Sequence, residues 1–148
     1  MSCSRGKEEE IKKLLSLLLA EDDDSLRETL SIYFASQGFQ VFQAGTGKEA
    51  VDIAMERRIA FSVMDVNMPI LNGIDAFRFI VRERGRIPCI FMSGDTSLHN
   101  MEQALQAGGF PFIPKPIRMD LMQASVDRLI AKYFLRMRSE SRRPEQDR

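Results

Sequence analysis

The chain has 148 residues, 44% of them hydrophobic and 28% charged, which fits one domain that buries a core and stays soluble. Its 21 basic residues balance 21 acidic ones, which argues against a dedicated nucleic-acid binder, because such domains usually carry a basic excess. Two cysteines are too few for a disulfide framework or a thiolate metal site. The longest apolar run is far shorter than the roughly 20 residues that span a bilayer, and acids stand where a signal peptide would be apolar. We therefore expect a cytoplasmic protein without membrane contact.

Short apolar segments alternate with amphipathic segments along the chain. Residues 1–13 are polar and charged and are expected to form a lead-in tail. The apolar runs that predict strands are 14–20, 39–44, 60–64, 88–92 and 110–113. The segments that predict helices are about 25–37, 46–58, 74–84, 98–107 and 119–135. Residues 136–148 are almost without apolar side chains and are expected to be a disordered tail or a truncated linker.

Polar residues mark the beginnings of two of the expected helices. Thr46 and Glu49 have the spacing of a capping box, in which a hydroxyl and a carboxylate satisfy free backbone amides. Asp23 and Asp24 follow the first strand and are expected to cap the next helix rather than to take part in chemistry.

Five strands that each precede a helix imply a parallel sheet with helices on both faces. Right-handed crossovers then predict an α/β fold with a doubly wound, five-stranded, flavodoxin-like (βα)5 sheet in the order 2-1-3-4-5. We find no internal repeat and no second domain, so residues 14–135 are expected to form one domain.

Polar side chains follow four of the expected strands at the same end, where ligands bind in such sheets. They are Glu21 and Asp22 after the first strand, Asp65 after the third, Ser93 after the fourth and Lys115 after the fifth. Three neighbouring acids would raise one another's pKa, and Mg²⁺, which prefers oxygen ligands, would relieve that repulsion. Asp65 could then accept a phosphoryl group whose charge Mg²⁺, Lys115 and Ser93 stabilise, while Gly94 leaves room for the donor. Each of these residues taken alone could be a cap, a turn residue or a solvated charge. Their placement at the same end of different strands favours a shared role in a reaction.

These segments resemble the receiver domain of two-component response regulators over about residues 14–134. The matching pieces are Leu18-Leu19-Ala20-Glu21-Asp22-Asp23, Met64-Asp65-Val66-Asn67-Met68-Pro69 with Gly73, Phe91-Met92-Ser93-Gly94 and Lys115-Pro116. The resemblance implies that Asp65 is phosphorylated by a partner histidine kinase or phosphotransfer protein. It implies that Asp22, Asp65 and the backbone carbonyl of Asn67 bind Mg²⁺ directly, while Glu21 acts more often through water.

The resemblance also implies a switch made of Ser93 and Phe112, in which Ser93 moves towards the phosphoryl group and the aromatic ring turns inward. It suggests a cis peptide bond between Lys115 and Pro116. The output surface would be the face of about 98–107, 110–113 and 119–134, which would contact a downstream target or effector domain, with a homodimer left open. Glu21 replaces the commoner Asp, Ser93 the commoner Thr, and Phe112 lacks the hydroxyl often found there.

Three functions are compatible with these residues. The favoured one is a signalling switch rather than a conventional enzyme, with self-phosphotransfer and slow autodephosphorylation at Asp65. The second is a protein-interaction module with a receiver fold that is never phosphorylated. The third is an aspartate-nucleophile phosphohydrolase, which Asn67 disfavours because those enzymes carry a second Asp at that position. His99, the only histidine, is expected to be solvated and not a phosphodonor.

Overall fold

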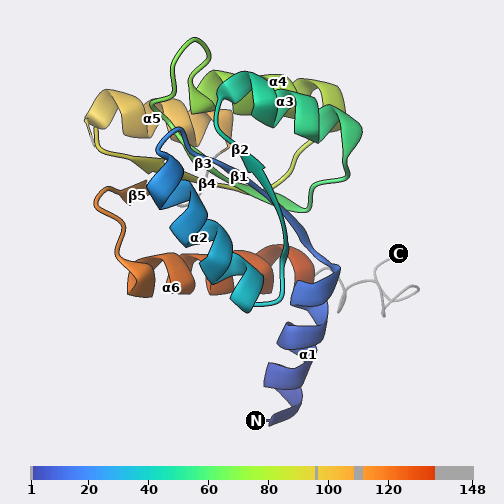
Figure 1. The fold of residues 1–148 in the computed structure, drawn as a ribbon. Helices are drawn as coiled ribbons and strands as arrows, with labels where there is room; N and C mark the ends of the chain where they lie inside the picture. The colour runs from blue at the N-terminus through green and yellow to red at the C-terminus, as the bar shows by residue number, and fades with distance from the viewer. Residues whose placement is uncertain (1, 96, 109–111, 136–148) are drawn as a thin grey trace, which may run out of the picture.

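The computed structural model describes residues 2–95, 97–108 and 112–135, which form one parallel sheet covered by helices on both faces (Figure 1). The strands are β1 (Ser16–Ala20), β2 (Gln40–Ala44), β3 (Phe61–Asp65), β4 (Cys89–Ser93) and β5 (Phe112–Pro114). All neighbours pair in parallel in the order β2-β1-β3-β4-β5, which confirms the predicted topology. The tail expected at 136–148 and the beginning of the fifth expected strand lie outside the described residues.

The register of the sheet brings the carboxyl ends of four strands together. Asp65, the last residue of β3, is paired with Met92 of β4, and Ser93 is paired with Pro114 of β5. Ala20, the last residue of β1, is paired with Met64. The residues that end or directly follow these strands therefore meet at one edge of the sheet.

The helices between the strands are α2 (Asp24–Ser36), α3 (Gly47–Glu56), α4 (Gly73–Arg84) and α5 (Leu98–Ala107). After β5 comes α6 (Met119–Ile130), which continues into a π-helical turn, η1 (Ala131–Leu135). The side chain of Asp23 accepts a hydrogen bond from the Leu26 amide, and Thr46 accepts one from Glu49. The cap by Asp23 and the Thr46 half of the predicted capping box are confirmed, whereas Asp24 lies in the first turn of α2. Among the described helices, none has the length and apolar character needed to cross a membrane.

Alternating strand residues divide the apolar core between the two faces of the sheet. Leu17 and Leu19 of β1 lie in the core under α2 and α6, whereas Leu18 and Ala20 lie in the core under α3, α4 and α5. All four are fully buried. This period of two is what a central strand of a doubly wound sheet requires, because its side chains point alternately to either face.

Residues 2–13, which the sequence predicted to be a lead-in tail, instead belong to helix α1 (Ser2–Leu14). Ile11 is only 7% exposed and joins the core beneath α2 and α6. The ammonium group of Lys12 donates to the side-chain oxygen of Gln37 at 3.3 Å and lies 3.9 Å from the carboxylate of Asp127. The helix therefore packs by its last turn at the amino-terminal edge of the sheet, opposite the edge where the polar residues meet (Figure 1).

Candidate functional site

Three carboxylates gather at the carboxyl edge of the sheet. Glu21 directly follows β1, Asp22 comes next, and Asp65 ends β3; one oxygen from each lies within 4.8 Å of the others. Glu21 is fully buried and Asp65 is 2% exposed, whereas Asp22 faces solvent. Hard oxygen ligands without His or Cys fit a magnesium ion, so the donor set agrees with the cation expected from the sequence.

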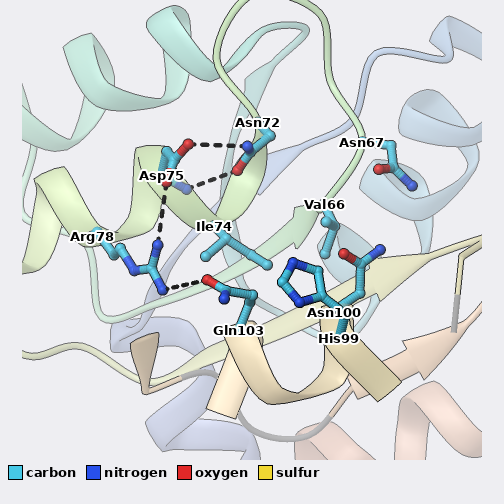
Figure 2. A pocket seen from close by; sticks show the side chains of 9 residues that line it. All are labelled: Val66, Asn67, Asn72, Ile74, Asp75, Arg78, His99, Asn100 and Gln103. Atoms are coloured by element: carbon cyan, nitrogen blue, oxygen red, sulfur yellow. Dashed lines mark hydrogen bonds and ion pairs between the residues drawn. The ribbon is translucent and has the colours of Figure 1, made fainter. Parts of the chain in front are cut away.

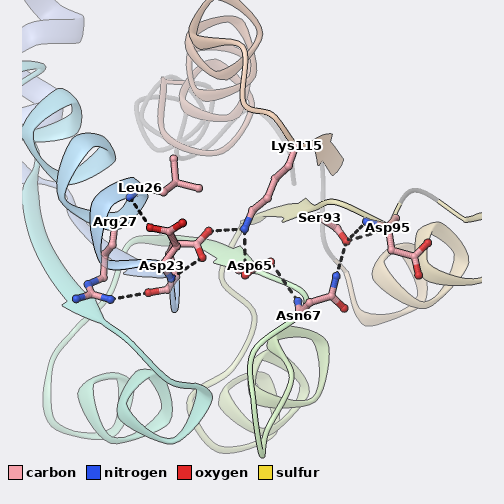
Figure 3. A network of polar contacts seen from close by, with 9 residues as sticks. Asp23, Leu26, Arg27, Asp65, Asn67, Ser93, Asp95 and Lys115 are labelled. Atoms are coloured by element: carbon pink, nitrogen blue, oxygen red, sulfur yellow. Dashed lines mark hydrogen bonds and ion pairs between the residues drawn. The ribbon is translucent and has the colours of Figure 1, made fainter.

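Lys115 provides the positive charge beside these acids (Figure 3). Its ammonium nitrogen lies 2.7 Å from Glu21 Oε1, as an ion pair without hydrogen-bond geometry, and 3.1 Å from Asp65 Oδ2. Its backbone amide donates to the Ser93 carbonyl at 2.8 Å, which fixes the loop after β5 against β4. The Lys115–Pro116 peptide bond is cis, as the resemblance suggested.

Burial changes the proton affinities of all three charged groups. It raises the pKa of Glu21 to about 7, although Lys115 opposes the shift. Burial likewise raises the pKa of Asp65 above its ordinary value. For Lys115, burial lowers the pKa, but the Glu21 and Asp65 carboxylates outweigh it and raise the pKa overall. The Lys115 ammonium thus does not offset the effect of burial on the pKa of either acid.

The loop after β3 holds the Asp65 carboxylate in place. The backbone amide of Asn67 donates to Asp65 Oδ1 at 3.1 Å, and the amide of Gly73 donates to the Val66 carbonyl at 2.9 Å. A Cβ atom at Gly73 would stand 2.0 Å from the Asp65 carbonyl oxygen, so only glycine permits this approach. In the same loop, between Asn67 and Gly73, Ile70 has a φ of 71° and a fully exposed side chain.

Ser93, at the end of β4, is fully buried. Within the described part of the chain, its hydroxyl group forms hydrogen bonds with Asn67 and Asp95 and not with Asp65. Its oxygen accepts from the Asn67 side-chain amide at 3.0 Å and from the Asp95 backbone amide at 3.0 Å. It donates to the Asp95 carbonyl at 3.1 Å. The sequence did not predict the Asn67 side-chain contact, which joins the loop after β3 to the last residue of β4.

The remaining predicted residues surround this centre. Phe112 is half-buried and packs against the core beneath α3, α4 and α5. A Cβ atom placed on Gly94 would have no neighbour within 4 Å, which agrees with the expected open space. Pro116 directly follows Lys115 and is exposed. The structure therefore brings Glu21, Asp22, Asp65 and Lys115 into one cluster, with Asn67 and Ser93 at its border.

A polar cavity of about 210 Å³ lies beside Asn67, between the first turns of α4 and α5 (Figure 2). On its α4 side, Arg78 lies 3.4 Å from Asp75 and donates to the Gln103 side chain at 2.8 Å. His99 lines the cavity from the first turn of α5 and is exposed, as expected for a solvated histidine. The Arg78 guanidinium in the cavity wall is therefore already bound to the Asp75 carboxylate and the Gln103 side chain.

Comparison with known proteins gives a consistent family assignment. The family model for the response regulator receiver domain matches residues 17–127. The regulatory protein AtoC of Escherichia coli is 30% identical over 114 residues, which cover 77% of this chain and 25% of AtoC. The chain spans about half the length of other curated regulators that it matches.

Solved structures with a similar fold support the same family assignment. The non-phosphorylated HemR receiver domain of Leptospira biflexa is 28% identical, with a TM-score of 0.73, and the match covers 78% of this chain and 94% of that one. The CheX–CheY–BeF3–Mg complex of Borrelia burgdorferi shares the fold at 24% identity, with a TM-score of 0.74 and coverage of 78% and 89%. The chain therefore belongs to the response regulator receiver domain family, whose general role is a phosphorylation-controlled signalling switch rather than a conventional enzyme.

Proposed function

We propose that this domain is an active switch in which Asp65 accepts a phosphoryl group from a partner histidine kinase or phosphotransfer protein. The observation that carries the proposal is the buried Asp65 carboxylate, 3.1 Å from the Lys115 ammonium and within 4.8 Å of two further carboxylates. A receiver fold used only for protein contacts would have no need for buried charges, which are costly unless they are paired or bind a cation.

The metal ligands in this proposal are Asp22, Asp65 and the backbone carbonyl of Asn67, with Glu21 acting through water. Their oxygen donors suit Mg²⁺, and the fold-related Borrelia complex contains magnesium and beryllofluoride. When bound, Mg²⁺ would neutralise negative charge on the transferring phosphoryl group.

The residues of the chain itself perform the remaining steps. A carboxylate oxygen of Asp65 forms a new bond to phosphorus while the phosphorus–nitrogen bond of the donor phosphohistidine breaks, and the electron pair returns to the imidazole, which takes up a proton. Lys115 stabilises the charge on the phosphoryl oxygens from 3.1 Å away. Ser93 would donate to a phosphoryl oxygen after leaving the Asp95 carbonyl. Hydrolysis of the acyl phosphate is expected to be slow, because Asn67 is a poor proton donor or acceptor.

The output surface in this proposal is the face of α5, β5 and α6. Met101 and Leu105 on α5 and Leu121 on α6 are large apolar side chains that remain 39–66% exposed. Phe112, on the strand between these helices, is half-buried and could adjust with Ser93. A downstream protein, an effector domain or a second copy of the chain would recognise this face once phosphorylation biases the equilibrium between two conformations.

The proposal is tested by incubating the purified domain with Mg²⁺ and acetyl phosphate and following the intact mass. We expect the wild-type protein to gain the mass of one phosphoryl group, and Asp65→Asn to gain none. Asp52→Asn, which removes an exposed aspartate on α3, is the matched control and should be modified like the wild type. A folded wild-type sample that shows no gain, and no spectral change with beryllofluoride, would instead support a phosphorylation-independent interaction module.

A further inference from the structure

We infer that the side chain of Asn67 is a positioning residue that holds the Ser93 hydroxyl in a resting orientation and thereby opposes activation. This inference rests on the proposed function, in which the Asn67 side chain serves only to explain slow hydrolysis of the acyl phosphate. Its basis is the direct hydrogen bond from Asn67 Nδ2 to Ser93 Oγ, 3.0 Å long (Figure 3).

The Ser93 hydroxyl has no hydrogen-bonding capacity left in this conformation. A hydroxyl group offers one donor and two acceptor sites. The donor site is used by the Asp95 carbonyl at 3.1 Å, and the acceptor sites are used by the Asn67 amide and the Asp95 backbone amide, each at 3.0 Å. Phosphoryl oxygens only accept, so Ser93 can bind one only by withdrawing its proton from Asp95.

Burial makes this rearrangement depend on Asn67. Ser93 has no exposed surface, so water cannot easily replace a lost partner at its oxygen. Asn67 itself is exposed, and Asp95 is too, so their groups can turn to solvent when Ser93 leaves. The cost of moving Ser93 is therefore borne at the serine oxygen, where the Asn67 side-chain amide and the Asp95 backbone amide both donate, and only the first of these can be removed by substitution.

Asn67 also touches the reacting group through its backbone. Its amide donates to Asp65 Oδ1 at 3.1 Å, while its side chain donates to Ser93. One residue thus contacts both the expected phosphoacceptor and the hydroxyl group that must respond. Asn67→Ala removes the side-chain bond and leaves the backbone amide and carbonyl in place, which makes the side-chain contribution separable.

The experiment measures the affinity of the domain for beryllofluoride in the presence of Mg²⁺ by 19F and 1H–15N NMR. Loss of one hydrogen bond from the resting state should let Asn67→Ala bind the mimic about two- to tenfold more tightly than the wild type. The Ser93 Hα–Hβ couplings of the unliganded variant should change from one rotamer towards an average of several. Asn100→Ala is the matched control, because the Asn100 amide donates to the Asp95 carbonyl at 3.3 Å and not to Ser93.

A double-mutant cycle shows whether Asn67 acts through Ser93. In a Ser93→Ala background, Asn67→Ala should no longer increase affinity. An unchanged or weaker affinity of the single variant, or an equal gain in Asn100→Ala, would overturn the inference. If the wild type bound no mimic, the proposed function would fail, whereas the Ser93 couplings of the unliganded proteins would still decide whether Asn67 holds the hydroxyl group.

Discussion

Single residues control how closely backbone segments approach one another at the site, and Gly73 is the clearest case. A side chain at this position would collide with the Asp65 carbonyl oxygen, 2.0 Å from the expected Cβ position. Because that oxygen belongs to the backbone of a buried strand, it cannot move aside without displacing Asp65. Gly73→Ala is therefore expected to lower the free energy of unfolding by about 1–3 kcal/mol, as overpacking usually does.

Urea unfolding followed by circular dichroism checks this prediction, with Gly94→Ala as the matched control. A Cβ atom on Gly94 meets nothing within 4 Å, so that variant should stay within about 0.5 kcal/mol of the wild type. Equal effects of the two substitutions would show that the approach at Gly73 is not the constraint.

At the level of residues, the sequence predicted the side chains that stand at the ends of strands. It did not predict a side-chain contact that depends on the shape of a loop. Asp65, Ser93 and Lys115 could be predicted because parallel strands align their carboxyl ends at one edge. The contact from the Asn67 side chain to Ser93 could not, because it depends on how two loops fold over that edge. No periodicity in the sequence reports such a contact.

Among the elements, α1 is the one that hydropathy failed to predict. Residues 1–13 contain few apolar side chains, and without an apolar stripe a helix gives no periodic signal. In the structure the helix packs against the core through one apolar residue, Ile11, beside the contacts of Lys12 with Gln37 and Asp127. By contrast, the described ends of the strands and of the other helices agree with the prediction within about two residues, if η1 is counted with α6, because most of these elements bury apolar side chains.

The attachment of α1 can be tested with two substitutions in the same turn. Ile11 is 7% exposed and Leu14 is 82% exposed, so only the first loses buried contacts when cut to alanine. We expect Ile11→Ala to reduce the free energy of unfolding by about 2 kcal/mol or more and Leu14→Ala by less than about 0.5 kcal/mol. Thermal unfolding of the two variants beside the wild type would reveal this difference, and similar melting temperatures would mean that α1 does not contribute to the core.

For the whole molecule, the buried acids couple stability to pH. Burial raises the pKa of Glu21 from 4.5 to about 7, so the folded domain binds this proton more tightly than the unfolded chain. The stabilisation is complete below the unfolded value and is lost as the pH rises through about 7. Metal-free wild-type protein should therefore lose stability between pH 5 and pH 8, by no more than about 3 kcal/mol from this group.

Urea unfolding in EDTA at several pH values measures this dependence. Glu21→Gln, which cannot ionise, should show a shallower decline over the same pH range, and added Mg²⁺ should restore stability to the wild type at pH 8. A wild-type domain whose stability increased from pH 5 to pH 8, with no difference from Glu21→Gln, would contradict the assignment of the shifted proton to Glu21.

In the proposed function, the charges of the acidic cluster also set the order in which the cation and the phosphodonor bind. With all groups ionised, three carboxylates face one ammonium, which leaves two negative charges at the place where an anionic phosphodonor must approach. In the proposed function a divalent cation cancels this excess first, and only then is the donor no longer repelled. The domain would in that case act as a coincidence detector, which responds to its kinase only while the cation is present.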